Sequence, residues 1–231
     1  MQLTVLDPLN ADQAFPPLNK ALKHPNGLLA VGGCLSNNRL INAYRHGVFP
    51  WYNPDEPILW WSPDPRLVLF PDQLVVSRSL HKLLKKKLFT ITYDQAFSRV
   101  IEACAKPRKE ESGTWISHEI NQAYNSLHWQ GVAHSAEAWL DGELVGGLYG
   151  LALGRVFFGE SMFYTKPDAS KVAFVTLVEH LKSWNYQLID CQVHTSHLAR
   201  FGAQEIDRAH FAKLLDEYCD SPASQAAWQF E

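Results

Sequence analysis

The chain has 231 residues, which is enough for one large domain or for two domains of unequal size. With 46% hydrophobic and 19% charged residues, its composition excludes a disordered or fibrous protein, and no run of about 18 apolar residues predicts a membrane-spanning helix. The first residues show no basic segment followed by an apolar one, so we expect no signal peptide. The four cysteines are widely spaced, as is typical of reduced thiols in a cytoplasmic protein.

The net charge of −3 conceals an uneven distribution. Residues 1–115 carry 14 Lys and Arg against 10 Asp and Glu, a net of +4, whereas residues 116–231 carry 7 against 14, a net of −7. Part of the positive excess lies in a run without acidic residues, whose basic members are Arg78, Lys82, Lys85, Lys86 and Lys87. Such a run favours binding of a polyanion, although a solvated helix face gives the same pattern.

The N-terminal residues are rich in turn residues and aromatic side chains. The many prolines in the range Pro16–Pro65 argue against a regular sheet here. One helix is expected over Asn37–His46, with Ser36 as its N-cap. We therefore predict a small irregular domain over residues 1–62 and a larger domain over residues 63–231.

After the proline-rich region the pattern alternates between strands and helices, as hydrophobic periodicity and capping residues indicate. The expected elements are a strand over Arg66–Phe70, a basic helix from Ser79 to about Lys87, a strand over Phe89–Tyr93, a helix from Asp94 to Ala105, a polar loop over Lys106–Thr114 and a helix from about His118 to Gln130.

A three-stranded antiparallel meander is expected next. Its apolar runs are separated by Asp141–Gly142 and Gly154–Arg155, and Asp-Gly between two such runs is a strong hairpin signal. An amphipathic helix over Ser170–Asn185, a strand over Leu188–Val193, a short helix and a last helix to about Tyr218 complete the pattern. This order predicts an α/β (α+β) fold of the GNAT-like N-acyltransferase type, which is an analogy of fold and indicates no reaction.

Three polar residues of the last strands are candidates for chemistry. Alternation along a strand places Asp190 and Gln192 on one face, and Glu160 lies in the preceding strand. If the two strands splay apart, the three side chains meet in a cleft. There Asp190, polarised through Gln192, could accept the proton of an attacking amine, while Glu160 could hold a cationic amine or orient a ribose. Equally, Asp190 could cap a turn and Glu160 could pair with a lysine.

Apolar residues around these strands offer a pocket for a hydrophobic side chain. Such a pocket would reject polar side chains strongly and neighbouring apolar ones weakly, while ordinary core packing gives the same stripe. The candidates are Leu148, Phe157, Met162, Phe174, Leu177, Leu181 and Ile189.

Other features bear on ligands. Trp115 follows a polar loop and could stack an unpaired base of a nucleic acid. No glycine-rich pyrophosphate loop precedes the helix over Ser170–Asn185, so coenzyme A is not expected, and no Walker A or Rossmann fingerprint is present. His194 and His197 lack a third ligand, so we expect no metal site and no cofactor.

Several strings occur together in this chain: PNGLLAVGGCL, YRHGVFPWY, ILWWSPDPR, GTWIS, GVAHSAEAW, GESMF and LIDCQV. In this combination the sequence closely resembles the bacterial leucyl/phenylalanyl-tRNA–protein transferases, from about residue 15 to 215. The resemblance implies an enzyme that transfers Leu or Phe, and Met weakly, from aminoacyl-tRNA to the N-terminal amine of proteins that begin with Arg or Lys. It further implies that these proteins enter the N-degron degradation pathway.

The resemblance also implies roles for single residues. It assigns catalysis to Asp190 and Gln192, with Glu160 as a further active-site acid, and it assigns the apolar set above to the donor side-chain pocket. It places three aromatic residues near the 3′ end of the donor tRNA, namely Trp51, Trp115 and Tyr124. Leu148, Leu177 and Leu181 stand where the family also has Met or Phe, which leaves the preference between Leu and Phe open.

Two alternatives stay open. The first is a GNAT acyltransferase that uses coenzyme A, against which the missing pyrophosphate loop argues. The second is a tRNA-binding module without activity, against which carboxylates in a cleft argue, because binding of bare tRNA gains nothing from them. For a tRNA donor, we expect the basic run to contact the tRNA body. The sequence indicates no oligomeric state.

Overall fold

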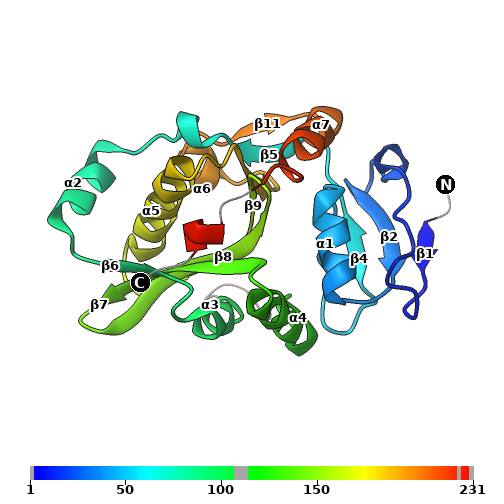
Figure 1. The fold of residues 1–231 in the computed structure, drawn as a ribbon, viewed down its shortest axis with the longest axis horizontal. Helices are drawn as coiled ribbons and strands as arrows, with labels where there is room; N and C mark the ends of the chain where they lie inside the picture. Colours follow the sequence, from blue (N-terminus) through cyan, green and yellow to red (C-terminus); the bar gives the residue numbers. More distant parts are fainter. Residues whose placement is uncertain (1–2, 107–113, 223–224, 229–231) are drawn as a thin grey trace.

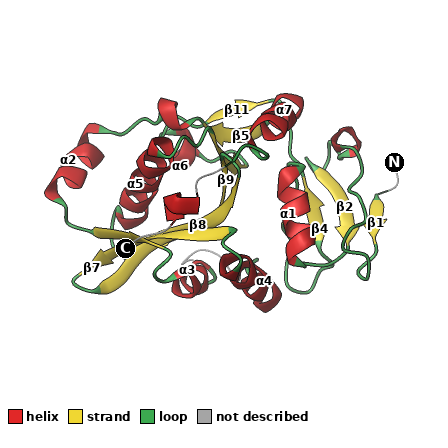
Figure 2. Cartoon of the chain, viewed as in Figure 1, coloured by secondary structure: helices red, strands yellow, loops and turns green. Residues whose placement is uncertain are grey.

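The computed structural model describes residues 3–106, 114–222 and 225–228, which fold into two sheets with flanking helices (Figures 1 and 2). Most of the predicted polar loop, residues 107–113, lies outside the described residues. Within the described ranges, no helix combines the length and the apolar character that crossing a membrane requires.

The N-terminal part contains a four-stranded sheet in the order β1-β2-β4-β3. Its elements are β1 (Thr4–Leu6), η1 (Leu18–Lys20), β2 (Leu28–Gly32), α1 (Asn37–Arg45), β3 (Phe49–Pro50) and β4 (Leu59–Trp61). The expectation that prolines prevent a regular sheet here is wrong. The strands are only two to five residues long, and the one strand proline, Pro50, lies in the edge strand β3, where a missing N–H is tolerated.

A seven-stranded sheet in the order β11-β5-β10-β9-β8-β7-β6 forms the larger part. Its strands are β5 (Arg66–Leu69), β6 (Thr90–Tyr93), β7 (Ala133–Leu140), β8 (Glu143–Leu153), β9 (Val156–Tyr164), β10 (Leu188–Gln192) and β11 (Gln204–Ile206). β9 and β10 pair in parallel, and the other neighbours pair antiparallel. The predicted hairpin is confirmed: Asp141 (φ 51) and Gly142 (φ 80) both have the positive φ of a type I′ turn.

Helices cover both faces of the large sheet (Figure 1). α5 (Ala169–Ser183) packs on one face, and α3 (Phe97–Cys104) and α4 (His118–Trp129) pack on the other. Gly146 allows α5 to approach β8 closely, because a Cβ at this position would lie 2.6 Å from the Cβ of Ala169. The remaining elements are η2 (Pro71–Gln73), α2 (Arg78–Lys86), α6 (Ser196–Ala199), α7 (Arg208–Tyr218) and η3 (Gln225–Trp228).

Two predicted helix N-caps are wrong by two residues each. α2 begins after Ser77 instead of Ser79, because the Ser77 hydroxyl accepts the capping hydrogen bond from the helix. α3 begins after Ala96 instead of Asp94, whose carboxylate accepts the backbone N–H of Ser135 on β7. In the second case a tertiary partner occupies the side chain that would otherwise cap the helix.

The fold class agrees with the prediction. An antiparallel meander (β7, β8, β9) leads through α5 to β10, which pairs in parallel with β9, and this is the GNAT-like α/β arrangement. The chain passes from the small sheet to the large one between Trp61 and Arg66. A domain division at residues 62 and 63 stays a prediction.

Candidate active site

The polar candidates lie where β9 and β10 separate. The parallel pairing of these strands ends with Asp190 opposite Phe158. Glu160 and Gln192 lie beyond this last pair, one on each strand. The two strands therefore diverge at the place where the sequence predicted a cleft.

Glu160 accepts hydrogen bonds from three side chains. Its Oε1 accepts the Tyr44 hydroxyl and Nε2 of Gln192, each at 2.7 Å, and its Oε2 accepts the Tyr124 hydroxyl at 3.1 Å. The hydroxyls of Tyr44 and Tyr124 also lie within hydrogen-bond distance of each other, so their two hydrogens are shared among these three contacts. Residues from α1, α4 and β10 thus converge on one carboxyl group of β9, so the small N-terminal sheet region contributes to the site through α1.

This environment changes the acidity of Glu160. Burial raises its pKa to about 8, with a smaller contribution from the negative charge of Asp190, while the hydrogen bonds from the two tyrosines and Gln192 oppose the rise. Burial also raises the pKa of Tyr44 and Tyr124, so both hydroxyls stay protonated donors. A carboxyl group that changes charge near pH 8 is typical of acid–base chemistry.

Asp190 has a different environment. It is 0% exposed, and its two oxygens accept Nε and Nη2 of Arg66 at 2.8 and 2.6 Å. Oδ1 also accepts the backbone N–H of Gln192 at 2.9 Å. The Asp190 carboxylate therefore holds the backbone N–H of Gln192. Because it is fully buried, an amine cannot reach it.

The register of β10 shifts between Asp190 and Gln192, and Gln192 has a left-handed backbone (φ 62). Both side chains nevertheless point to the same side of the sheet, as alternation predicted. On that side Asp190 contacts Arg66. Gln192 contacts Glu160 there, beside the two tyrosines.

Arg66 is a residue of the site that the sequence did not single out. Its guanidinium lies 4.8 Å from the ring centre of Phe49 and 4.6 Å from that of Phe211, and its Nη1 donates to the carbonyl of Gly47 at 3.2 Å. It joins the α1–β3 turn, α7 and β10. The sequence does contain a signal for it. Arg66 is the first residue of an otherwise apolar strand, and an arginine that is buried in such a strand requires an acidic partner.

The predicted aromatic residues separate into two kinds. Trp51 is 47% exposed and Trp115 is half-buried. Tyr124 is fully buried, and only its hydroxyl reaches the site. The two tryptophans therefore offer ring surface to a ligand, whereas Tyr124 offers a hydrogen-bond donor. Tyr44, the other donor, was not predicted.

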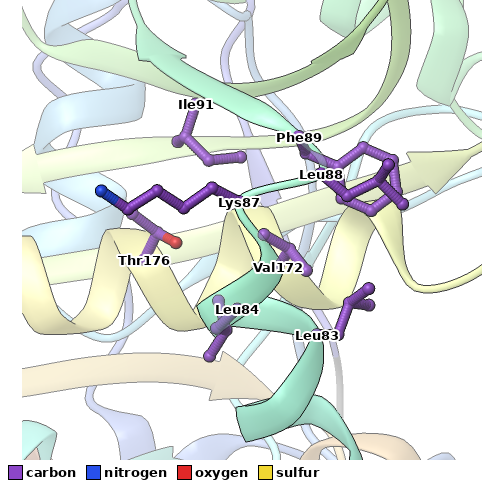
Figure 3. A pocket seen from close by; sticks show the side chains of 8 residues that line it. All are labelled: Leu83, Leu84, Lys87, Leu88, Phe89, Ile91, Val172 and Thr176. Carbon is purple, nitrogen blue, oxygen red and sulfur yellow. The ribbon is translucent and has the colours of Figure 1, made fainter.

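The seven apolar pocket candidates lie in one cluster on the α5 face of the sheet. Six are buried, and Met162 packs against them half-buried. The cavity of about 170 Å³ in Figure 3 lies elsewhere, between α2, β6 and α5, and none of the seven lines it. The structure thus brings the seven predicted pocket residues together, and they pack against one another in one apolar cluster.

The basic run lies on α2, at the end of the molecule opposite the small sheet (Figure 1). Its side chains are exposed, and none of them forms an ion pair with another described residue. Among the residues that the structure describes, no group of three or more His, Cys, Asp or Glu could hold a metal ion, and His194 faces Glu205 at 3.4 Å instead.

A titratable carboxyl and an amide between two diverging strands of a GNAT-like sheet are groups that acyl transfer to an amine can use. Comparison with known proteins gives the particular family. Residues 68–216 match the leucyl/phenylalanyl-tRNA protein transferase family, and residues 33–64 match the N-terminal domain of the same family.

Individual relatives agree with the family match. The chain is 57% identical to the leucyl/phenylalanyl-tRNA–protein transferase of Nitrosomonas europaea over 223 residues, which cover 96% of this chain and 94% of that protein. It is 59% identical to that of Pseudomonas fluorescens over 214 residues, or 93% and 94% of the two chains. The solved structure of L-PGS from Bacillus licheniformis aligns with 71% of this chain and 56% of its own, at 14% identity and a TM-score of 0.43. The chain belongs to the leucyl/phenylalanyl-tRNA protein transferase family and is an aminoacyltransferase.

Proposed function

We propose that the protein transfers Leu or Phe, and Met weakly, from aminoacyl-tRNA to the N-terminal amine of proteins that begin with Arg or Lys, which then enter the N-degron pathway. Membership of the family supports the reaction class. The observation that carries the proposal is the Glu160 carboxyl, held by two tyrosines and Gln192 where β9 and β10 separate. A carboxyl group there can accept the proton that an attacking amine loses.

The reaction is aminolysis of an ester. The neutral amine nitrogen attacks the carbonyl carbon of the aminoacyl ester, a C–N bond forms, and the bond from that carbon to the ribose oxygen breaks. The nitrogen loses one proton and the ribose oxygen gains one. One group that accepts the proton from the nitrogen and then donates a proton to the ribose oxygen therefore balances the reaction, and no other reactant is needed.

We assign this proton relay to Glu160 instead of Asp190. A base is most effective when its pKa lies near the working pH, and the pKa of Glu160 is about 8, close to the value of about 7.7–8.0 for an α-amine. Asp190 is enclosed by Arg66 and fully buried. It acts as a positioning residue, because its bond to the backbone N–H holds Gln192 in the left-handed conformation.

Gln192 orients the acceptor in this scheme. Its Nε2 donates to Glu160, which leaves its carbonyl Oε1 to accept an N–H of the amine. Holding the amine and the proton acceptor in one geometry removes part of the entropic barrier to the reaction.

The donor occupies three surfaces in the proposal. The 3′ adenosine stacks on Trp51 and Trp115, with the hydroxyl of Tyr124 nearby, and the Leu or Phe side chain enters the apolar cluster around Phe157. The tRNA body contacts the basic run on α2, whose exposed lysines favour a polyanion.

The test is transfer of labelled leucine from Leu-tRNA to a peptide that begins with Arg. We expect transfer to this peptide and to a Lys peptide, but not to the same peptide with an acetylated N-terminus, which has no nucleophilic amine. Phe-tRNA should also serve as donor, whereas Lys-tRNA should fail because a charge would be buried unpaired. Equal transfer to Arg and Glu peptides would contradict the acceptor specificity, and transfer from leucyl-coenzyme A but not Leu-tRNA would contradict the donor class.

A further inference from the structure

The described C-terminal turn, η3, lies against the α5 face of the large sheet (Figure 1). Ala227 is 0% exposed and belongs to the same apolar cluster as the proposed donor pocket. Its carbonyl oxygen accepts Nε2 of His180 at 2.7 Å, and Nε1 of Trp228 donates to the hydroxyl of Tyr186 at 3.0 Å. Two hydrogen bonds and one buried residue thus hold the turn at a fixed position.

The ring of Trp228 lies over a part of the sheet where β8 has a glycine and therefore no side chain. Its ring stacks on His134 of β7 (4.0 Å between centres, 11° between planes) and on Phe157 of β9 (5.9 Å, 26°). Between them on β8 is Gly150, which pairs with His134. The Phe157 ring lies over this glycine, since a Cβ there would come within 2.6 Å of the ring tip. Phe157 is therefore enclosed between a residue without a side chain and the indole of Trp228.

The position of Phe157 links this packing to the cleft. It precedes Phe158, whose pairing with Asp190 is the last before β9 and β10 diverge. Its ring is 1% exposed and belongs to the cluster with Leu148 and Ile189. A donor side chain that enters the cluster from the cleft therefore meets the Phe157 ring, and the ring cannot retreat because Trp228 lies behind it.

We propose that Trp228 is a specificity-determining residue, which fixes the ring of Phe157 and so sets the depth of the donor side-chain pocket. This inference rests on the proposed function. Replacing Trp228 with a small residue leaves space into which Phe157 turns, and the deeper pocket then favours the larger Phe donor over Leu. Neither residue contacts the reacting atoms, so the effect lies in donor choice.

The experiment compares kcat/KM for Phe-tRNA and Leu-tRNA, each transferred to one Arg peptide. The ratio of the two values does not depend on the folded fraction of a preparation. In Trp228→Ala we expect the ratio to shift toward Phe by about 10-fold, the size expected for a change of a few methylene groups in an apolar pocket. Trp228→Phe, which keeps the stack but loses the bond to Tyr186, should stay within about threefold of wild type. Trp184→Ala is the matched control, because Trp184 lies near His180 but does not stack on Phe157.

The possible outcomes separate the proposals. An unchanged ratio in Trp228→Ala overturns the pocket role, as does an equal shift in Trp184→Ala. A parallel rise for both donors would also overturn it and would indicate that the turn blocks the site. If Trp228→Ala does not fold, Trp228→Leu decides, with a smaller shift in the same direction expected. Failure of the wild-type protein to use either donor would contradict the proposed function itself.

Discussion

Asp190 and Glu160 are two carboxyl groups on neighbouring parallel strands, and their environments are opposite. Asp190 lies before the strands separate, where the guanidinium of Arg66 binds both of its oxygens. Glu160 lies beyond the separation, where neutral donors surround it and burial raises its pKa to about 8. The guanidinium gives Asp190 a buried ion pair, whereas a buried carboxyl among neutral donors, such as Glu160, has a raised pKa and can exchange a proton. The comparison teaches that the position of an acid relative to the last strand pair decides whether a cation or neutral donors surround it.

Both acids depend on the small N-terminal region. Arg66 is held there by the carbonyl of Gly47 and the ring of Phe49, and Glu160 receives a hydrogen bond from Tyr44 on α1. The N-terminal sheet thus supports the geometry of the site as well as carrying Trp51.

The largest expected effect is on catalysis, from Glu160→Gln. This change keeps the shape and most hydrogen bonds but removes the proton acceptor, so we expect kcat to fall about 10²–10⁴-fold. Single-turnover transfer at saturating donor measures it. Binding of Leu-tRNA should stay unchanged, and a kcat within about threefold of wild type would show that no base acts here.

Asp190→Ala should instead act on stability. It leaves the guanidinium of Arg66 buried without a partner, which typically costs about 3–5 kcal/mol. Urea unfolding of the variant and the wild type measures the difference. The double variant Arg66→Met with Asp190→Leu is the control, because it removes both charges and should recover much of the stability. Wild-type stability in Asp190→Ala would mean that the ion pair is not a structural element.

Smaller effects are expected from Tyr44→Phe and Tyr124→Phe. Each removes a hydrogen bond that lowers the pKa of Glu160, so each should raise this pKa by about one unit and lower the rate at pH 7 about 10-fold. Tyr149→Phe is the matched control. Tyr149 is equally buried and contacts the ring of Tyr124, but its hydroxyl has no hydrogen-bond partner among the described residues. Equal losses in all three variants would indicate packing as the cause.

Much of the fold could be predicted because local signals and tertiary structure agree. The α1 cap at Ser36 and the turn at Asp141 and Gly142 are local, and both are confirmed. The small sheet was missed because its short strands carry little periodicity between prolines. The start of α3 was missed because a strand far along the chain takes the carboxylate of Asp94.

The site could be predicted only in part. The two acids and Gln192 are visible in the sequence, and so is the divergence of their strands. Which acid is enclosed by a cation depends on Arg66, 124 residues away from Asp190 along the chain. Which acid receives neutral donors depends on Tyr44 and Tyr124. None of these partners can be recognised from hydrophobic periodicity, because their contacts are made across the fold.

The pH dependence of transfer tests the central claim most directly. In the proposed mechanism both the acceptor amine (pKa about 7.7–8.0) and Glu160 (pKa about 8) must lose a proton before the attack, so the active form increases as pH rises through these values. A plot of log kcat/KM against pH should rise with a slope approaching about 2 below pH 7 and level off above about pH 8. Glu160→Gln should rise with a slope of about 1, from the amine alone, whereas Asp190→Asn should keep the steeper slope even if its rate is low. A slope of about 2 in Glu160→Gln together with a slope of about 1 in Asp190→Asn would contradict the account. It would show that Asp190 accepts the proton.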